Sequence, residues 1–150
     1  MIWVIALLGL LTIGPASAEP RVVEGLASVR DDGTLAVAGR RFSLYGIELA
    51  PFGRDCRTSL RPVRCGQRAV LVLDDLVHGF VRCTPVDTVS AVCTVSGRRM
   101  FDPPVDLAAR LLIEGFALTR ENAPYQYRQL EKIAMSRKAG IWGENFIDIR

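Results

Sequence analysis

The sequence predicts a single α+β domain in which a small β-barrel of five strands carries three helices. With 150 residues, of which 49% are apolar and 23% charged, the chain is long enough for one hydrophobic core and too short for two domains. The spacing of apolar residues changes twice, from strand-like alternation to helical periodicity and back. Glycine residues stand where the spacing changes, as expected for the ends of elements.

The segment from Val22 to Leu49 predicts a three-stranded meander. β-Branched and aromatic residues are frequent in it, and glycines interrupt it. Asp31-Asp32-Gly33 supplies the first tight turn and Gly39 the second, because glycine adopts positive φ without strain. The predicted strands comprise residues 22–29, 34–39 and 41–47.

A helix and a hairpin follow the meander. In residues 67–77 the apolar side chains fall on one helical face, and Gly79 ends the helix. Residues 80–84 and 89–95 return to strand character and are separated by a turn-like segment. Five strands with one inserted helix therefore predict a small barrel.

Two further helices are predicted in the last third of the chain. Asp102 is a suitable N-cap with Pro103 in the first turn, and this helix runs through Ile113 to a stop at Gly115. The final helix ends before Gly140, and its apolar stripe comprises Tyr127, Leu130, Ile133 and Ala134.

The first 18 residues contain no charged side chain and predict a signal peptide. An apolar run leads to Ala16-Ser17-Ala18, the small-x-small pattern of a signal peptidase site. We therefore expect a mature domain of residues 19–150, exported to the periplasm or secreted. The apolar run also approaches the length of a membrane-spanning helix, so the alternative is a retained anchor.

Four cysteines predict disulfide bonds, because an exported domain folds in an oxidising compartment. Three pairings of Cys56, Cys65, Cys83 and Cys93 are possible, and their spacing favours local bridges. Each such bridge would contribute about 2 to 3 kcal/mol. A zinc site is disfavoured, since the sequence has no Cys-x-x-Cys and its single histidine lies at a predicted helix end.

Short motifs follow one another along the predicted mature chain. They are Asp31-Asp32-Gly33-Thr34-Leu35, Leu44-Tyr45-Gly46-Ile47-Glu48 with Ala50-Pro51, Cys65-Gly66-Gln67 with Ala69, Ala91-Val92-Cys93, Gly115-Phe116-Ala117, Tyr127 with Glu131, and Gly140-Ile141-Trp142. Their order and spacing resemble the staphylococcal-nuclease-like (thermonuclease) family. This resemblance implies an OB-fold barrel with three helices. It also implies the two short-range bridges, Cys56–Cys65 and Cys83–Cys93.

The chemistry that this resemblance implies is calcium-assisted phosphodiester hydrolysis. Carboxylates hold the ion, a glutamate activates water, and two arginines bind phosphate oxygens. Most of these groups are replaced at the matching positions. The second ligand carboxylate falls on Gly33, the two arginines on Ser43 and Thr88, and the glutamate on Phe52 or, with a different placement of one extra residue, on Pro51.

Three carboxylates remain as candidate metal ligands: Asp31, Asp32 and Glu48. Asp32 compensates for Gly33 if the turn slips by one residue, and Glu48 matches a ligand aspartate. A missing general base costs about 100- to 10,000-fold in rate, and a missing transition-state arginine on the order of 1,000-fold. We therefore expect a catalytically degenerate domain without a cofactor. The alternative is an active calcium-dependent nuclease with a rearranged site.

Arginine dominates the basic side chains, providing 17 of 19, while the net charge is only +3. A charge this small does not require nucleic acid as partner, and a solvated surface also explains it. Arg40, Arg41 and Arg54 are the candidate anion-binding residues, near the face where an OB-fold binds its ligand. The hypothesis is a monomeric binding module for nucleic acid, a phosphorylated glycan or an acidic protein. A structural envelope protein held by an uncleaved N-terminal helix is a further alternative.

Overall fold

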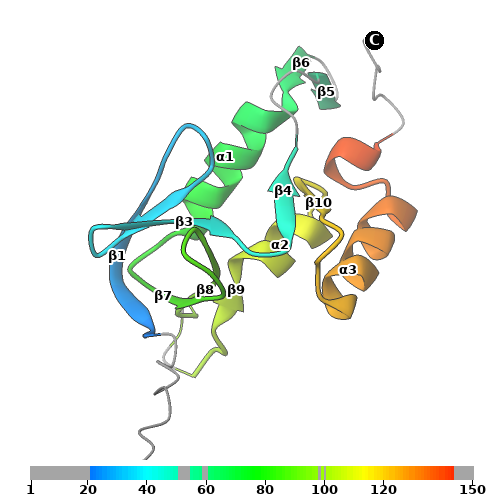
Figure 1. Cartoon of the computed structure of the whole chain (residues 1–150). Coiled ribbons are helices and arrows are strands. Elements are labelled where there is room, and N and C mark those ends of the chain that lie inside the picture. The colour runs from blue at the N-terminus through cyan, green and yellow to red at the C-terminus, as the bar shows by residue number, and fades with distance from the viewer. Residues whose placement is uncertain (1–20, 51–54, 59–60, 98, 100, 144–150) are drawn as a thin grey trace, which may run out of the picture.

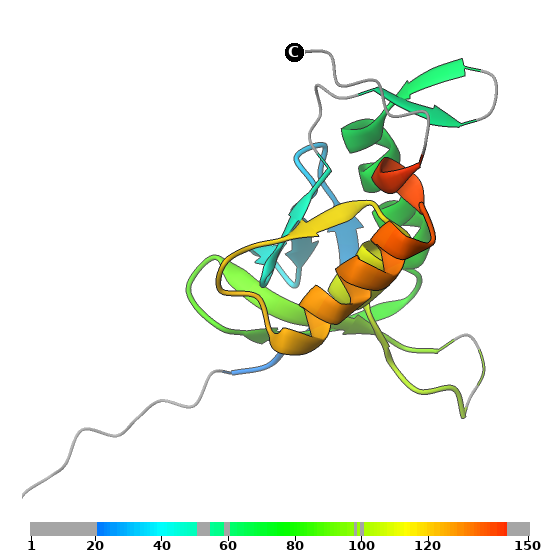
Figure 2. The same cartoon turned by 90° about the vertical axis from the view of Figure 1, so that its right-hand side faces the viewer.

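The computed structural model describes residues 21–50, 55–58, 61–97, 99 and 101–143, with side chains at 55–58 and 61–65 left out of the description. The predicted signal peptide lies outside these residues. In the described part, the chain folds as an α+β domain in which helices cover one side of a β-barrel (Figures 1 and 2).

Five strands form the barrel in the order β3-β2-β1-β7-β8. The central strand β1 (Val23–Val29) pairs antiparallel with β2 (Leu35–Val37) and with β7 (Phe80–Pro85). The outer pairs join β2 to β3 (Arg40–Leu44) and β7 to β8 (Ser90–Val95). A parallel pairing of β3 with β8 closes the barrel. The predicted five-stranded, OB-like α+β architecture is thereby confirmed.

The barrel core follows from the alternation that the sequence displays. In β2 and β7 every second side chain is buried, so one face of each strand is apolar and points inward. Cys83 and Cys93 are directly opposed on β7 and β8, are fully buried, and form a disulfide. This confirms one of the two predicted bridges. The side chains of Cys56 and Cys65 lie outside the described ones.

The predicted third strand is too long at its C-terminal end. Gly46 has φ 75° and breaks the chain between β3 and β4 (Ile47–Leu49). β4 leaves the barrel and pairs antiparallel with β10 (Ala117–Thr119), from much later in the chain. A separate hairpin joins β5 (Asp55–Thr58) to β6 (Arg61–Arg64).

Helix α1 (Cys65–Leu76) confirms the first predicted helix, but the predicted start of the second is wrong. Helix α2 spans Leu107–Ile113, and its N-cap is Asp106, whose Oδ1 accepts from the Ala109 amide at 3.1 Å. The residues before it pair with β8 as the short strand β9 (Val105–Asp106), which holds them extended. Asp102 and Pro103 therefore precede the helix as irregular chain.

The third predicted helix is α3 (Tyr125–Ser136), followed by a 3-10 turn at Gly140–Trp142. Tyr127 and Ala134 are buried as expected, whereas Ile133 is 37% exposed and lies at the edge of the apolar stripe. Helix α2 contacts both α1 and α3 and lies between α3 and the barrel (Figure 1). A search of the described helices for one able to cross a membrane found none.

Candidate functional site

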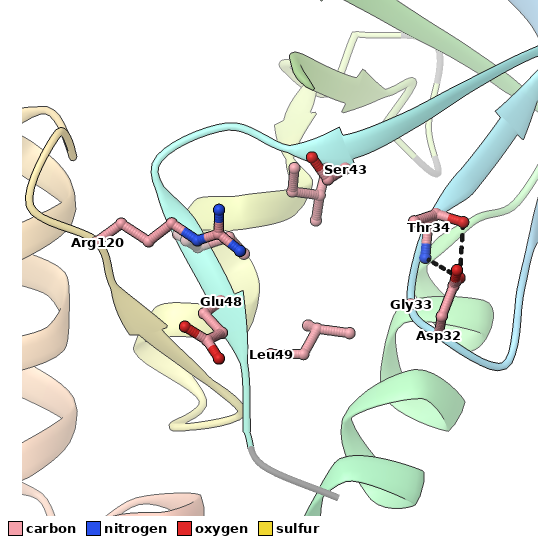
Figure 3. Close-up of a pocket in the computed structure, with 9 residues that line it drawn as sticks. Asp32, Gly33, Thr34, Ser43, Glu48, Leu49 and Arg120 are labelled. Atoms are coloured by element: carbon pink, nitrogen blue, oxygen red, sulfur yellow. Dashed lines mark hydrogen bonds between the residues drawn. The ribbon is translucent and has the colours of Figure 1, made fainter. Parts of the chain in front are cut away.

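A cavity of about 350 Å³ opens between the β1–β2 turn, β3, β4 and the connection from β10 to α3 (Figure 3). It contains several of the residues that the sequence singled out, together with one that it did not. Its lining comprises Asp32, Gly33, Thr34, Ser43, Leu44, Ile47, Glu48, Leu49 and Arg120. We call this cavity the β4 pocket.

The β1–β2 turn forms one wall of the β4 pocket. Asp32 Oδ1 accepts from the backbone amide of Thr34 at 2.9 Å and from its hydroxyl at 2.7 Å. The hydrogen bond from the Thr34 hydroxyl is the main cause that lowers the pKa of Asp32, with a smaller effect from the guanidinium of Arg41. The Asp32 side chain is therefore a carboxylate at neutral pH.

Gly33 occupies the position where the family resemblance places a ligand carboxylate. Its φ is 77°, and a Cβ atom built on it would lie 2.0 Å from Cδ1 of Leu49. Both the turn and the adjoining β4 side chain therefore require glycine here. This turn therefore has no room for the carboxylate side chain that the resemblance implies at this position.

Ser43 lies on β3 at the position of the first expected arginine. Its backbone amide and its hydroxyl both donate to the carbonyl of Val89, at 2.8 and 3.2 Å. These bonds belong to the region where β3 meets β8 and closes the barrel. Ser43 therefore contributes a hydroxyl that is already bonded, and no positive charge.

Thr88, at the position of the second expected arginine, is exposed in the β7–β8 turn and does not line the β4 pocket. Asp87 holds this turn by accepting from the amides of Val89 and Ser90 and from the Ser90 hydroxyl. The Ser90 hydroxyl is the main cause that lowers the pKa of Asp87. The turn thus presents a negative charge where the resemblance implies a positive one.

Glu48 and Arg120 form the wall of the β4 pocket opposite the β1–β2 turn. Glu48 is exposed on β4, directly across the ladder from Leu118 on β10. Figure 3 shows the Arg120 side chain reaching across β4 toward Ser43. Sequence reasoning missed Arg120, since no motif marks it and only the pairing of β10 with β4 brings it here.

The three predicted metal ligands are not brought together. Asp32 and Glu48 line the β4 pocket, whereas Asp31 does not; Asp31 and Asp32 together line a neighbouring hollow with Gln67 and Leu71. Among the described residues, no three carboxylate, histidine or cysteine side chains are placed to hold a metal ion. Calcium takes about six to eight oxygen ligands, so Asp32 and Glu48 alone would leave most of its coordination to other ligands.

Two of the three predicted anion-binding arginines, Arg40 and Arg41, do not line the pocket. Arg40 and Arg41 are exposed on β3, and the Arg40 guanidinium lies 4.8 Å from the ring centre of Phe42. Arg41 is close enough to Asp32 to affect its pKa. Arg54 lies outside the described residues, as do Phe52 and Pro51, the two candidates for the position of the catalytic glutamate.

Comparison with known proteins adds no family assignment. No protein-family model matches the chain, and no curated protein matches its sequence.

Proposed function

We propose that the chain is a staphylococcal-nuclease-like OB-fold domain that has lost the catalytic chemistry of that family and binds an anionic partner. The proposal combines the order of motifs in the sequence with the OB-like barrel that the chain forms. An OB-fold barrel is a common scaffold for binding oligonucleotides and oligosaccharides. Fold alone does not define activity, so the function has to follow from the residues of the β4 pocket.

The observation that carries the proposal is that Gly33 and Ser43 both have structural roles in the barrel. Both stand where the resemblance implies catalytic or metal-binding groups. Gly33 is needed for a positive-φ turn against Leu49, and Ser43 is bonded to Val89 at the barrel closure. Glycine has no side chain to hold a metal ion, and the hydroxyl of Ser43 carries no positive charge to neutralise a phosphoryl group. Binding without efficient hydrolysis is the function that remains.

Arginine side chains near the β4 pocket support an anionic partner. Arg120 lines the pocket, and Arg40 and Arg41 are exposed on β3, the strand that also contributes Ser43. The guanidinium group matches two oxygens of a phosphate or carboxylate at once. Tyr45 is a poor stacking platform here, because its hydroxyl donates to the Asn122 carbonyl at 3.2 Å and it is partly buried. Charge is thus the main source of affinity in this proposal.

The proposed setting is outside the cytoplasm, in the periplasm or the medium. The buried Cys83–Cys93 disulfide fits an oxidising compartment. The apolar, uncharged start of the sequence supports the same proposal. We propose that the domain works there as a monomer.

The test is a binding and cleavage assay on the purified protein. Fluorescein-labelled single-stranded DNA and a phosphorylated mannan are the probes, each tested with calcium and with a chelator. We expect binding of at least one probe without calcium, weakening as salt is raised, and no chelator-sensitive cleavage. Absence of binding to both probes at low salt would refute the proposal.

A calcium-dependent nuclease is the second candidate, because Asp32, Glu48 and Arg120 line one pocket. In the same assay this candidate predicts shortened DNA products that appear with calcium and disappear with the chelator. Glu48→Ala should abolish those products, because Glu48 would be required as a ligand or base. Cleavage that persists in Glu48→Ala would point instead to a contaminating nuclease.

A further inference from the structure

Another cavity, of about 430 Å³, lies where the end of α1 meets the start of β7, the end of β8 and β9. Its lining comprises Asp75, Leu76, His78, Gly79, Phe80, Val95, Ser96, Gly97 and Val105. We call this cavity the α1–β7 pocket. It has no lining residue in common with the β4 pocket, so a ligand bound here is separate from the anionic partner proposed above.

The elements around the α1–β7 pocket are held by backbone pairing, which keeps the cavity in shape. Val95 of β8 is paired with Val81 of β7 and with Val105 of β9, so three strands are joined along one wall. On the other side, Gly79 has φ 74° and turns the chain from α1 into β7. Small-molecule sites in proteins are usually preformed concave surfaces of this kind.

Apolar side chains form most of the lining. Leu76, Val95 and Val105 are half-buried or buried and present a fixed apolar surface. The Phe80 side chain is 66% exposed, although it stands on a central barrel strand directly opposite Leu26. An aromatic ring that becomes buried removes a large apolar area from water. A ligand with an aromatic body would therefore gain affinity by covering Phe80.

The charges at this end of α1 favour a cation. Asp75 is the one carboxylate among the described residues of the lining, and no arginine or lysine accompanies it. Within the described part of the chain, Asp75 forms no ion pair or hydrogen bond. It lies in the last turn of α1, where unpaired carbonyl groups give a helix end a partial negative charge. Basic residues are favourable at such an end, but the last turn of α1 contains none.

Asp75 is exposed, so its charge selects the sign of the ligand more than it strengthens binding. An exposed ion pair changes an affinity by up to about 5-fold, and a cation over an exposed aromatic ring adds a similar factor. The apolar walls provide the rest. A ligand of about ten heavy atoms is then expected to bind in the millimolar range.

We propose that the α1–β7 pocket binds an aromatic ammonium ion. The aromatic ring lies against Phe80 and Val105, and the ammonium group lies between Asp75 and the C-terminal end of α1. The hydroxyl of Ser96, also in the lining, can accept a further hydrogen bond from the ammonium. One carboxylate balances one positive charge, and a volume of about 430 Å³ is within the range for a single small ligand.

The test is an NMR titration of the purified, isotope-labelled protein at pH 8. Phenethylammonium is the probe, and 2-phenylethanol and 3-phenylpropionate are ligands of similar size that are neutral and negatively charged. We expect the ammonium to bind about 5- to 10-fold more tightly than the alcohol, and the carboxylate to bind most weakly. The amide signals of Gly79, Ser96 and Gly97 should shift, whereas those of Gly33 and Thr34 in the β4 pocket should not.

Two pairs of variants separate the pocket from general effects of charge and apolar surface. Asp75→Asn should weaken binding of the ammonium by about 2- to 5-fold and leave binding of the alcohol unchanged, a pattern that misfolding does not produce. Asp74→Asn makes the same charge change on the adjacent exposed residue, which does not line the pocket, and should keep the preference for the ammonium. Phe80→Leu should weaken both ligands, whereas Phe101→Leu, at a 94% exposed ring outside the pocket, should weaken neither.

Three results would overturn the inference. The first is an alcohol or a carboxylate that binds as tightly as the ammonium. The second is a preference for the ammonium that Asp75→Asn reduces no more than Asp74→Asn does. The third is the absence of shifts at Gly79, Ser96 and Gly97 with up to about 50 mM ligand, well above the expected dissociation constant. None of these readouts depends on DNA or mannan, so the proposed function is tested separately.

Discussion

The Tyr127→Phe substitution tests how the last helix is attached to the barrel. Tyr127 is 2% exposed, and its hydroxyl donates to Oδ2 of Asp106 at 2.6 Å. The other oxygen of Asp106 caps α2 through the Ala109 amide. A single carboxylate thus joins α2 to α3. Removing a hydrogen bond to a charged group lowers the free energy of unfolding by about 1.5 to 3 kcal/mol, and we expect a loss in this range at pH 7.

The same variant should change the alkaline dependence of stability. Burial raises the pKa of Tyr127 above its ordinary value of 10.0, and the hydrogen bond to Asp106 adds to this effect. Above about pH 10 the unfolded tyrosine therefore loses its proton while the native one keeps it, so the native state binds more protons. Stability then falls as pH rises, by up to about 1.4 kcal/mol per pH unit for this group. Phenylalanine has no ionisable hydroxyl, so Tyr127→Phe lacks this pH dependence. The difference in unfolding free energy between the variant and the wild type should therefore shrink between pH 9 and pH 11.

Urea unfolding followed by circular dichroism at several pH values measures both effects. Tyr125→Phe is the matched control, since Tyr125 lies on the same helix, is 76% exposed, and should change stability by less than about 0.5 kcal/mol. Equal stability of the two variants at pH 7 would refute the proposed bond energy. A deficit of Tyr127→Phe that stays constant or grows toward pH 11 would refute the pKa argument.

Further predictions concern the turn at Gly33, the disulfide and the β7–β8 turn. Gly33→Asp should destabilise the fold by more than Gly39→Asp, because both residues have positive φ but only Gly33 faces Leu49. The positive φ alone should lower the free energy of unfolding by about 1 to 2 kcal/mol in each variant. Equal losses in urea unfolding would contradict the contact with Leu49. Replacing Cys83 and Cys93 together by alanine should lower the free energy of unfolding by about 2 to 3 kcal/mol, and a loss below 1 kcal/mol would be inconsistent with the loop-entropy estimate. Hydrogen bonds from Ser90 and Val89 should hold the pKa of Asp87 below its ordinary value of 3.8 in an NMR titration. The carboxylate therefore stabilises the native state above about pH 4, and this stabilisation is lost as pH falls through the native pKa. A midpoint at or above 3.8 would exclude these hydrogen bonds.

The barrel could be predicted from sequence because each of its strands carries a local signal. Alternating burial in β2 and β7 matches the alternation of apolar residues, and the turns at Gly33 and Gly39 have the positive φ expected of them. The strand patterns of β7 and β8 likewise predict a hairpin, and in this hairpin Cys83 lies opposite Cys93. Such patterns extend over only a few residues, so they predict a strand or a turn without information about the rest of the fold.

The start of α2 shows where local rules are insufficient. Asp102 with Pro103 and Asp106 both satisfy the preference for an acidic N-cap. The choice between them is made by β8, which pairs with Val105–Asp106 and keeps these residues extended. A contact with another part of the chain therefore decided the helix boundary.

The sequence by itself determined the α+β barrel and the hairpin that carries Cys83 and Cys93. The composition of the β4 pocket was decided only by the tertiary structure. Arg120 enters it because β10 pairs with β4, whereas Asp31 does not line it and lies with Asp32 at the neighbouring hollow beside α1. Side-chain patterns report local conformation, whereas the convergence of distant residues depends on strand pairing and packing across the whole domain.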